Sequence, residues 1–479
     1  MRSPSFCLVS LYNLEAMGLR SLHSTLVNAG FDTKMIFLKS DQRTREEQLV
    51  SSPNPITDKE IELFTDQVSI LNPDIVGFSL VSAHVPIVKK LADYLYFMRY
   101  KGKILLGGIH PTILPEDSIQ FSDMICRGEG EQPILDLAYC LSEGRDPYKL
   151  NNFWFNEDDV QIKNEMRART KYLDQNPVPI FRDEDCYIID NDIMAHKDPY
   201  RENTRYGIMV FRGCTFKCSY CCSSYLSKLY NGPKLRGRSP EHILSELIKV
   251  KKELPKIECI NFYDEVFSIA WPMLPEFLEQ YKKLINLPFY CEFYPGLVKE
   301  EVLIKLKDAG LKGVWLGVQS GSERTRREVF FRNYTNDIVL RDANLFHKHN
   351  ISVRYDFILD NPFETLEDKL DTISLMMKLP LPYTTNLFSL SWFPNTEITQ
   401  MALERGYITE DDIEGKKQKS FNNWVVRLDD KSKSEEDIFI DSMANMIAYS
   451  ASKGSIPEQW INDNIIALME TNDLQSLWV

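Results

Sequence analysis

Short apolar runs that alternate with amphipathic stretches constrain the fold of this chain more than any other sequence feature. In the first 150 residues, strand-like runs such as TKMIFL and KILLGG are separated by stretches with apolar residues three and four positions apart, such as PIVKKLADYLYFMRYKG. This alternation predicts a parallel sheet with crossover helices. We therefore predict an α/β fold that begins with a doubly wound, Rossmann-like domain over residues 1–150. Its ligand would bind beyond the carboxyl ends of the strands, in the loops after Leu80, Gly108 and Gly128.

The alternation resumes near Tyr206 after a less regular segment. Residues 151–200 contain a hairpin pattern, FWFNEDD followed by VQIKN, and then several prolines, so we regard them as a linker. Six further strand and helix units predict a partial (β/α)6 barrel over residues 201–400. Residues 401–479 are charged and helix-like, and we expect a small helical cap over the open end of the barrel.

Composition narrows the classes of function. The 479 residues suffice for two or three domains, and the formal net charge of -13 disfavours binding to nucleic acid. No apolar run is long enough for a membrane span, and the first residues lack a signal-peptide pattern. We therefore expect a cytoplasmic protein with reduced cysteines and a small-molecule substrate.

Four of the ten cysteines lie between positions 214 and 222. Cys214, Cys218 and Cys221 form a C-x3-C-x2-C motif directly after a strand-like run, so three thiolates lie on one loop. Three thiolates would leave one iron of a 4Fe–4S cluster open to a further ligand, whereas four would close it. A zinc site would need a fourth ligand, and the adjacent Cys222 would point the opposite way on an extended chain. We predict an iron–sulfur cluster on the three motif cysteines.

From Tyr206 to about Tyr407 the chain resembles the radical S-adenosylmethionine (SAM) enzymes. The cysteine spacing matches the CxxxCxxC motif of that family, and NFYDEVF, GVQSGS and RYDFILDNPFET resemble its SAM-binding segments in the same order. Asn361 and Asn395 stand where the family usually has glycine. The resemblance implies reductive cleavage of SAM to a 5'-deoxyadenosyl radical, with an electron donor such as flavodoxin or ferredoxin. It also implies that SAM is bound by Tyr220, Tyr263, Asp264, Glu265, Gln319, Ser320 and Arg354.

Residues 5–145 resemble the cobalamin-binding domain of many radical SAM enzymes, on the segments SLVSAH, GGIHPT and GEGE. The D-x-H-x-x-G signature, whose histidine ligates cobalt, is absent, so we expect no histidine on the cobalt. A histidine in a GGxHPT turn is expected to hold the loop by hydrogen bonding. The resemblance implies that cobalamin is bound by Ser79, Ser82, Gly107, Gly108, His110, Gly128, Glu129 and Gly130.

Together, the two resemblances imply cobalamin-dependent methylation of an unactivated carbon or phosphorus centre in a small biosynthetic substrate. A radical rearrangement, dehydration, epimerisation or cyclisation is the alternative, with the N-terminal domain serving a structural role. A non-catalytic iron–sulfur or corrinoid sensor is a third hypothesis. A sensor would need a DNA-binding or signalling segment, and none is evident in the sequence.

Overall fold

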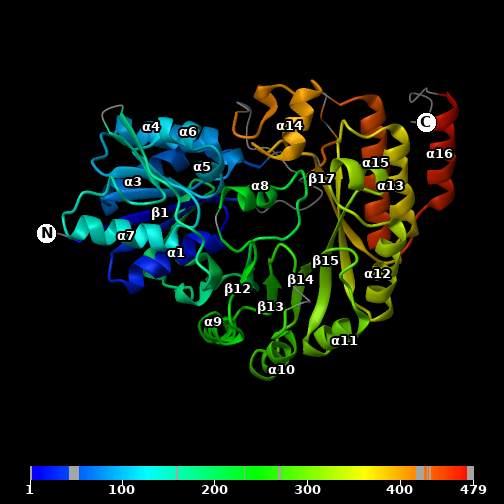
Figure 1. The fold of residues 1–479 in the computed structure, drawn as a ribbon, viewed down its shortest axis with the longest axis horizontal. Helices are drawn as coiled ribbons and strands as arrows, with labels where there is room; N and C mark the ends of the chain where they lie inside the picture. The colour runs from blue at the N-terminus through cyan, green and yellow to red at the C-terminus, as the bar shows by residue number, and fades with distance from the viewer. Residues whose placement is uncertain are drawn as a thin grey trace.

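The computed structural model contains two largely parallel sheets, with the cysteine loop and the helix after it between them (Figure 1). It describes residues 3–41, 53–157, 160–230, 232–267, 271–416, 425–428, 430 and 433–471. Within these ranges, no helix combines the length and apolarity needed to cross a bilayer.

The N-terminal sheet has nine strands in the order β7-β6-β5-β4-β3-β1-β2-β8-β9. Its centre is parallel, and the strand order reverses between β1 and β3, which is where ligands of doubly wound sheets bind. The strands are β1 (Phe6–Tyr12), β2 (Thr33–Ser40), β3 (Ile75–Ser79), β4 (Lys103–Gly107), β5 (Met124–Cys126), β6 (Phe153–Glu157), β7 (Val160–Lys163), β8 (Cys186–Asp190) and β9 (Ile193–His196).

Helices cover both faces of this sheet, which explains the nearly continuous apolar runs of its strands. Along β1, Cys7 and Val9 enter one core, while Phe6 and Leu8 enter the core on the opposite face. Figure 1 shows α3 and α4 on one face and α1 and α7 on the other. The helices are α1 (Met17–Asn28), α3 (Asp58–Leu71), α4 (Val85–Phe97), α5 (Ile109–Ile113), α6 (Pro115–Ser118) and α7 (Glu131–Ser142). The predicted Rossmann-like architecture is confirmed.

Residues 151–200 do not form a linker. They contribute strands β6 to β9 to the two edges of the N-terminal sheet. The hairpin pattern was correct, since β6 and β7 pair antiparallel, but β6 also pairs with β5. The sequence pattern predicted β6 and β7 but not β8 and β9. It gave no sign that open sheet edges would accept these strands, because such pairing is long-range.

The second sheet has six parallel strands in the order β10-β13-β14-β15-β16-β17, and it curls into the predicted partial barrel. Its strands are β10 (Arg205–Ile208), β13 (Cys259–Phe262), β14 (Phe289–Phe293), β15 (Leu311–Gln319), β16 (Ser352–Leu359) and β17 (Thr384–Ser389). A short ribbon of β11 (Phe211–Arg212) and β12 (Arg236–Gly237) flanks the loop that leads into α8 (Cys222–Leu229). The outer helices are α9 (Pro240–Glu253), α10 (Leu274–Leu284), α11 (Glu300–Ala309), α12 (Asn336–Lys348) and α13 (Leu366–Lys378).

The C-terminal region is not simply a cap over the barrel mouth. Helix α15 (Glu435–Ser452) packs against α13 and β17 as an outer helix, because Met443, Ala444 and Ile447 enter the barrel core. Figure 1 shows α16 (Glu458–Thr471) farther out on the same side. Helix α14 (Glu397–Glu404) and its flanking turns lie near the N-terminal sheet, where Asn395 Nδ2 donates a hydrogen bond of 2.9 Å to the Ile113 carbonyl.

Candidate functional site

A buried carboxylate binds the backbone directly before the loop with the cysteine motif. Asp264 is fully buried, and its Oδ1 accepts hydrogen bonds from the backbone amides of Val210 and Phe211 at 2.9 and 2.5 Å. Burial raises the pKa of Asp264 to about 7. Gly213 adopts a φ of +93°, and a Cβ there would lie 1.9 Å from the Lys234 carbonyl oxygen. The chain therefore requires glycine directly before Cys214.

Cys214, Cys218 and Cys221 are free thiols on this loop, and Cys221 lies at the N-terminus of α8. Among the described residues, no three His, Cys, Asp or Glu side chains converge on a point that could hold a metal ion. The described part of the chain thus offers no ready-made zinc site. A cubane binds each thiolate at a different iron, so its ligands stand farther apart than those of one ion.

Arg332 is a residue beside the cysteine loop that the sequence reasoning missed. Its Nη1 lies 3.8 Å from Cys218 Sγ and 2.7 Å from the Tyr220 hydroxyl, and its Nη2 donates to the Gly317 carbonyl at 2.8 Å. The guanidinium lies 4.2 Å from the centre of the Tyr294 ring. Arg332 thus places a buried positive charge beside Cys218. No sequence signal marked Arg332, because it follows the cysteines by 114 positions.

Polar and aromatic side chains line the inner face of the barrel. Along β16, Val353, Tyr355 and Phe357 pack into the core outside the sheet, so Arg354 and Asp356 face inward. Trp315 on β15 stands between Glu292 and Arg354 in the strand register. The Arg354 guanidinium lies 4.8 Å from the centre of the Trp315 ring.

Tyr263 also belongs to this inner face. Its ring stacks on Trp315 at 5.7 Å, and its hydroxyl accepts a hydrogen bond from Asn261. Two of the residues named from the SAM-like motifs, Arg354 and Tyr263, therefore meet at Trp315. Gln319 ends β15 with a φ of +72°.

Two other residues from these motifs are turned into the protein instead. Asp264 supports the cysteine loop as described above, and Ser320 is fully buried with its hydroxyl donating to Glu364 at 2.8 Å. In both segments the adjacent residue, Glu265 or Gln319, is more exposed to solvent than its buried neighbour. Glu265 is exposed and accepts a hydrogen bond from Ser223 at 2.8 Å.

Two inward-facing carboxylates, Glu292 and Asp356, were not predicted. Burial raises the pKa of Glu292 to about 8, with the negative charge of Asp356 as the next contribution. Burial likewise raises the pKa of Asp356 to about 6, opposed by the charge of Arg354. A glutamate within the otherwise apolar strand pattern FYCEF was the available sequence signal, since alternate residues of a strand face opposite sides.

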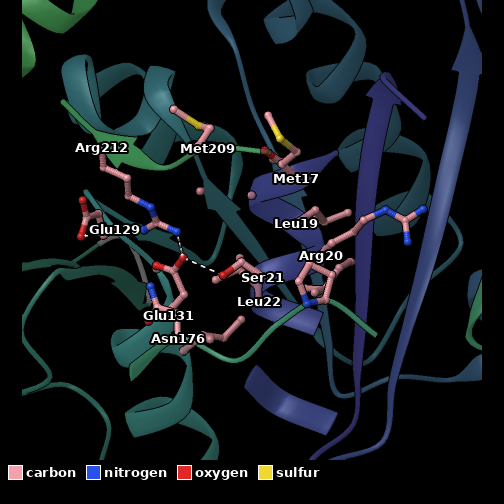
Figure 2. Close-up of a pocket in the computed structure, with 18 of the residues that line it drawn as sticks. Met17, Leu19, Arg20, Ser21, Leu22, Glu129, Glu131, Asn176, Met209 and Arg212 are labelled. Carbon is pink, nitrogen blue, oxygen red and sulfur yellow. Dashed lines mark hydrogen bonds and ion pairs between the residues drawn. The ribbon is translucent and has the colours of Figure 1, made fainter. Parts of the chain in front are cut away.

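A cavity of about 460 Å³ lies at the carboxyl edge of the N-terminal sheet and reaches β10 of the barrel (Figure 2). Its lining includes the hydroxyl-bearing side chain of Tyr200, which is 1% exposed and whose hydroxyl has no hydrogen-bond partner among the described residues. Six of the residues implied by the cobalamin-domain resemblance line this cavity: Ser79, Gly107, Gly108, Gly128, Glu129 and Gly130.

Ser82 and His110 do not line the cavity. His110 is fully buried, with Nδ1 at 2.9 Å from the Ser82 hydroxyl and Nε2 at 3.1 Å from Asp117 Oδ2. Both ring nitrogens are therefore engaged within the protein, as expected for a histidine that holds its loop.

The glycines around the cavity have different roles. A Cβ on Gly107 would meet no atom within 4 Å, so this position opens into free space. Gly108 has a φ of +100°, and a Cβ there would lie 2.9 Å from the Leu80 carbonyl oxygen. At Gly128 a Cβ would lie 2.7 Å from the Tyr230 hydroxyl. The lack of a side chain at Gly128 therefore leaves room for the Tyr230 ring.

The glutamates of the GEGE segment bind arginines of the barrel ribbon. Figure 2 shows Arg212 pointing at Glu131, which also meets Ser21. The distances are 2.6 Å from Arg212 Nη2 and 2.8 Å from the Ser21 hydroxyl to Glu131 Oε1. The two terminal guanidinium nitrogens of Arg236, Nη1 and Nη2, donate to Glu129. The glutamates therefore connect the edge of the N-terminal sheet to the ribbon of β11 and β12.

A second cavity of about 230 Å³ adjoins the first and reaches the cysteine loop. Gly108 and Gly128 contribute to both cavities from the N-terminal side. Cys214 and Glu265 line the smaller cavity from the barrel side. The edge implied to bind a corrinoid therefore faces the loop predicted to carry the cluster.

Comparisons with known proteins agree with this two-part arrangement. Residues 208–376 match the Radical SAM superfamily, and residues 6–138 match the B12 binding domain. An uncharacterized methyltransferase of Pyrococcus horikoshii is 24% identical over 349 residues, which cover 71% of this chain and 72% of the relative.

Two solved structures share the fold. The radical SAM methyltransferase TsrM from Kitasatospora setae, solved with cobalamin and a 4Fe–4S cluster, has a TM-score of 0.65 and 17% identity. That match covers 84% of this chain and 75% of TsrM. The cobalamin-dependent SAM radical enzyme OxsB has a TM-score of 0.67 and 16% identity, over 98% of this chain and 71% of OxsB.

Proposed function

We propose, from the matches of residues 208–376 to the Radical SAM superfamily and of residues 6–138 to the B12 binding domain, that this chain methylates an unactivated carbon or phosphorus centre of a small substrate. The methyl group would be carried by cobalamin, and SAM would be cleaved reductively at a 4Fe–4S cluster on Cys214, Cys218 and Cys221. The relatives named above include two methyltransferases, which supports this choice of reaction.

The position of the smaller cavity is the main support for this reaction. The smaller cavity is lined at once by Gly108 and Gly128 of the N-terminal sheet edge and by Cys214 and Glu265 of the barrel. A substrate in this cavity would lie between the two regions that would hold the corrinoid and the cluster. Such proximity is what group transfer between bound partners requires.

The residues around both sites suit these cofactors. Three free cysteines on a supported loop, with the Arg332 cation beside Cys218, form a donor set for iron. The large cavity provides an open position at Gly107 and the unpartnered Tyr200 hydroxyl, which suit a bulky ligand with polar groups. When bound, the cluster and the corrinoid would supply an electron for SAM cleavage and a methyl group for transfer.

The remaining work falls to residues that orient the reactants. Arg354 would pair with the SAM carboxylate, while Trp315 and Tyr263 provide a stacked aromatic wall on the inner face of the barrel. Glu265, which is exposed at the end of the β13 segment, would accept a hydrogen bond from the SAM amino group. Asp264 would act through the backbone by fixing the cysteine loop.

The test uses anaerobically reconstituted protein with a strong reductant. Wild-type protein should form 5'-deoxyadenosine from SAM, retain hydroxocobalamin, and transfer deuterium from methyl-labelled SAM to product once the substrate is known. The triple change of Cys214, Cys218 and Cys221 to Ala should abolish 5'-deoxyadenosine formation. Changing Cys259 to Ala serves as the control, because this buried cysteine lies away from the loop.

Retained SAM cleavage in the triple variant would overturn the cluster assignment. If the product formed without the deuterium label, or if the protein bound no corrinoid, methylation would be excluded. A radical rearrangement or dehydration would then be the favoured reaction.

A further inference from the structure

Arg169 is presented to the smaller cavity by the chain segment that follows β7. It lines this cavity together with Cys214, and its guanidinium stacks 3.9 Å from the centre of the Tyr230 ring. Its buried Nε has no hydrogen-bond partner, and within the described residues no carboxylate forms an ion pair with it. Burial lowers the pKa of the Arg169 guanidinium, and the negative charge of Glu129 opposes this only in part.

The two other arginines of this cavity are neutralised by glutamates. Arg212 pairs with Glu131. Arg236 pairs with Glu129 through two hydrogen bonds. Glu129 pairs with Arg236 and also lies 3.9 Å from Arg212 Nη1. Glu265, which lines the same cavity, accepts a hydrogen bond from Ser223. Among the residues described, Arg169 is thus the arginine of this cavity that forms no ion pair with a carboxylate, although Glu129 acts on it from a greater distance.

A guanidinium stays protonated in proteins, so it cannot escape the cost of burial by losing its charge. An unpaired, partly buried cation is expensive unless a ligand supplies the opposite charge. We propose that Arg169 binds an anionic group of the substrate, a carboxylate or a phosphate-type group, within the cavity beside Cys214. This inference rests on the proposed function and specifies the substrate class as anionic.

The planar fork of the guanidinium suits such a ligand, because it can donate two parallel hydrogen bonds to a carboxylate or phosphate. The Tyr230 ring holds the plane of the fork in place from one side. The corrinoid nucleotide tail also carries a phosphate, so the experiment must separate this source from the substrate.

Equilibrium dialysis with radiolabelled inorganic phosphate tests the proposal on reconstituted protein loaded with cobalamin. Wild-type protein should bind phosphate saturably, and Arg169→Gln should weaken binding about 10-fold or more, as expected for a lost charge-assisted pair. Arg169→Lys should retain part of the affinity. Arg167→Gln is the matched control, because Arg167 lies two residues away and already pairs with Asp136 at 2.7 Å.

The absence of phosphate binding in wild-type protein, or equal binding in Arg169→Gln with an unchanged melting temperature, would overturn the proposal. Affinities for cobalamin and for cobinamide, which lacks the nucleotide, supply the second arm. If Arg169→Gln weakened cobalamin binding alone, Arg169 would serve the corrinoid phosphate and the substrate assignment would fail. Failure of the proposed function would instead be seen as a lack of 5'-deoxyadenosine formation in wild-type protein.

Discussion

Arg212 Nη2 donates a hydrogen bond of 2.6 Å to Glu131 Oε1, and this contact joins the strand before the cysteine loop to the first turn of α7. Arg212 lies on the ribbon of β11 and β12, Glu131 begins a helix that covers the N-terminal sheet, and both line the large cavity. Burial acts to raise the pKa of Glu131, but the charge and hydrogen bonds of Arg212 outweigh burial and lower it. This pair therefore helps to join the carboxyl edge of the N-terminal sheet to the cysteine loop.

Changing Glu131 to Ala should lower the stability of the protein by about 1.5 to 3 kcal/mol, because Arg212 would lose a charge-assisted partner. The lowered pKa of Glu131 means that its contribution is present above the unfolded value of 4.5 and is lost as the pH falls below it. Thermal melting as a function of pH measures both effects. Glu143→Ala, which removes an exposed pair with Arg145, should change stability by less than about 1 kcal/mol.

Gly107 and Gly108 should respond differently to substitution. Gly107→Leu should preserve the fold and the cluster but expel the corrinoid, because the added side chain extends into the large cavity. Gly108→Ala should destabilise the protein by about 1 to 3 kcal/mol, because its positive φ and the Leu80 carbonyl oppose any Cβ. Corrinoid retention by absorbance and thermal melting separate the two outcomes. Full corrinoid retention in Gly107→Leu would exclude this cavity as the binding site.

His110 should not ligate cobalt. Its two nitrogens are engaged by Ser82 and Asp117, so the electron paramagnetic resonance spectrum of bound cob(II)alamin should show no histidine nitrogen splitting. His110→Asn should leave that spectrum unchanged while lowering stability by about 1 to 3 kcal/mol, as expected for lost buried hydrogen bonds. Nitrogen splitting that disappears in His110→Asn would contradict this assignment.

Arg354→Ala should weaken SAM binding by about 1.5 to 3 kcal/mol, through loss of a charge-assisted bond to the carboxylate. Iron and sulfide content should stay unchanged, because Arg354 supplies no thiolate to the cysteine motif. Calorimetric titration with SAM provides the measurement. Arg327→Ala is the control, since Arg327 forms an exposed pair with Glu328. Equal SAM affinity in wild type and Arg354→Ala would remove Arg354 from the SAM site.

Glu292→Gln should stabilise the protein at high pH. The carboxyl has a folded pKa of about 8 against an ordinary value of 4.5, so its ionisation costs stability progressively as the pH rises between these values. The variant should gain at least about 1.4 kcal/mol over wild type above pH 8, equivalent to one unit of pKa, and little below 4.5. Melting temperatures of both proteins across this range test the sign. A constant difference at all pH values would show that Glu292 does not titrate as described.

Local sequence patterns were enough to predict the parallel centre of the N-terminal sheet, the parallel sheet of the barrel and the place of the cysteine motif. Apolar periodicity is a local property, so the strands around Leu8 and Val314 could be predicted from their own residues. The motif with Cys214 could likewise be placed on a loop after a strand, because its spacing and the preceding apolar run are contiguous.

Tertiary structure alone decided which residues meet at the sites. The strands β6 to β9 joined the edges of the N-terminal sheet, and α15 joined the outside of the barrel, through pairing between distant segments. Asp264 and Glu265 are adjacent in sequence, yet one supports the backbone and the other lines a cavity. Arg332 and Arg169 reach the cysteine loop from distant segments. Such contacts depend on how the chain turns after each strand and on which side chains the assembled sheets bury, and no local pattern encodes either.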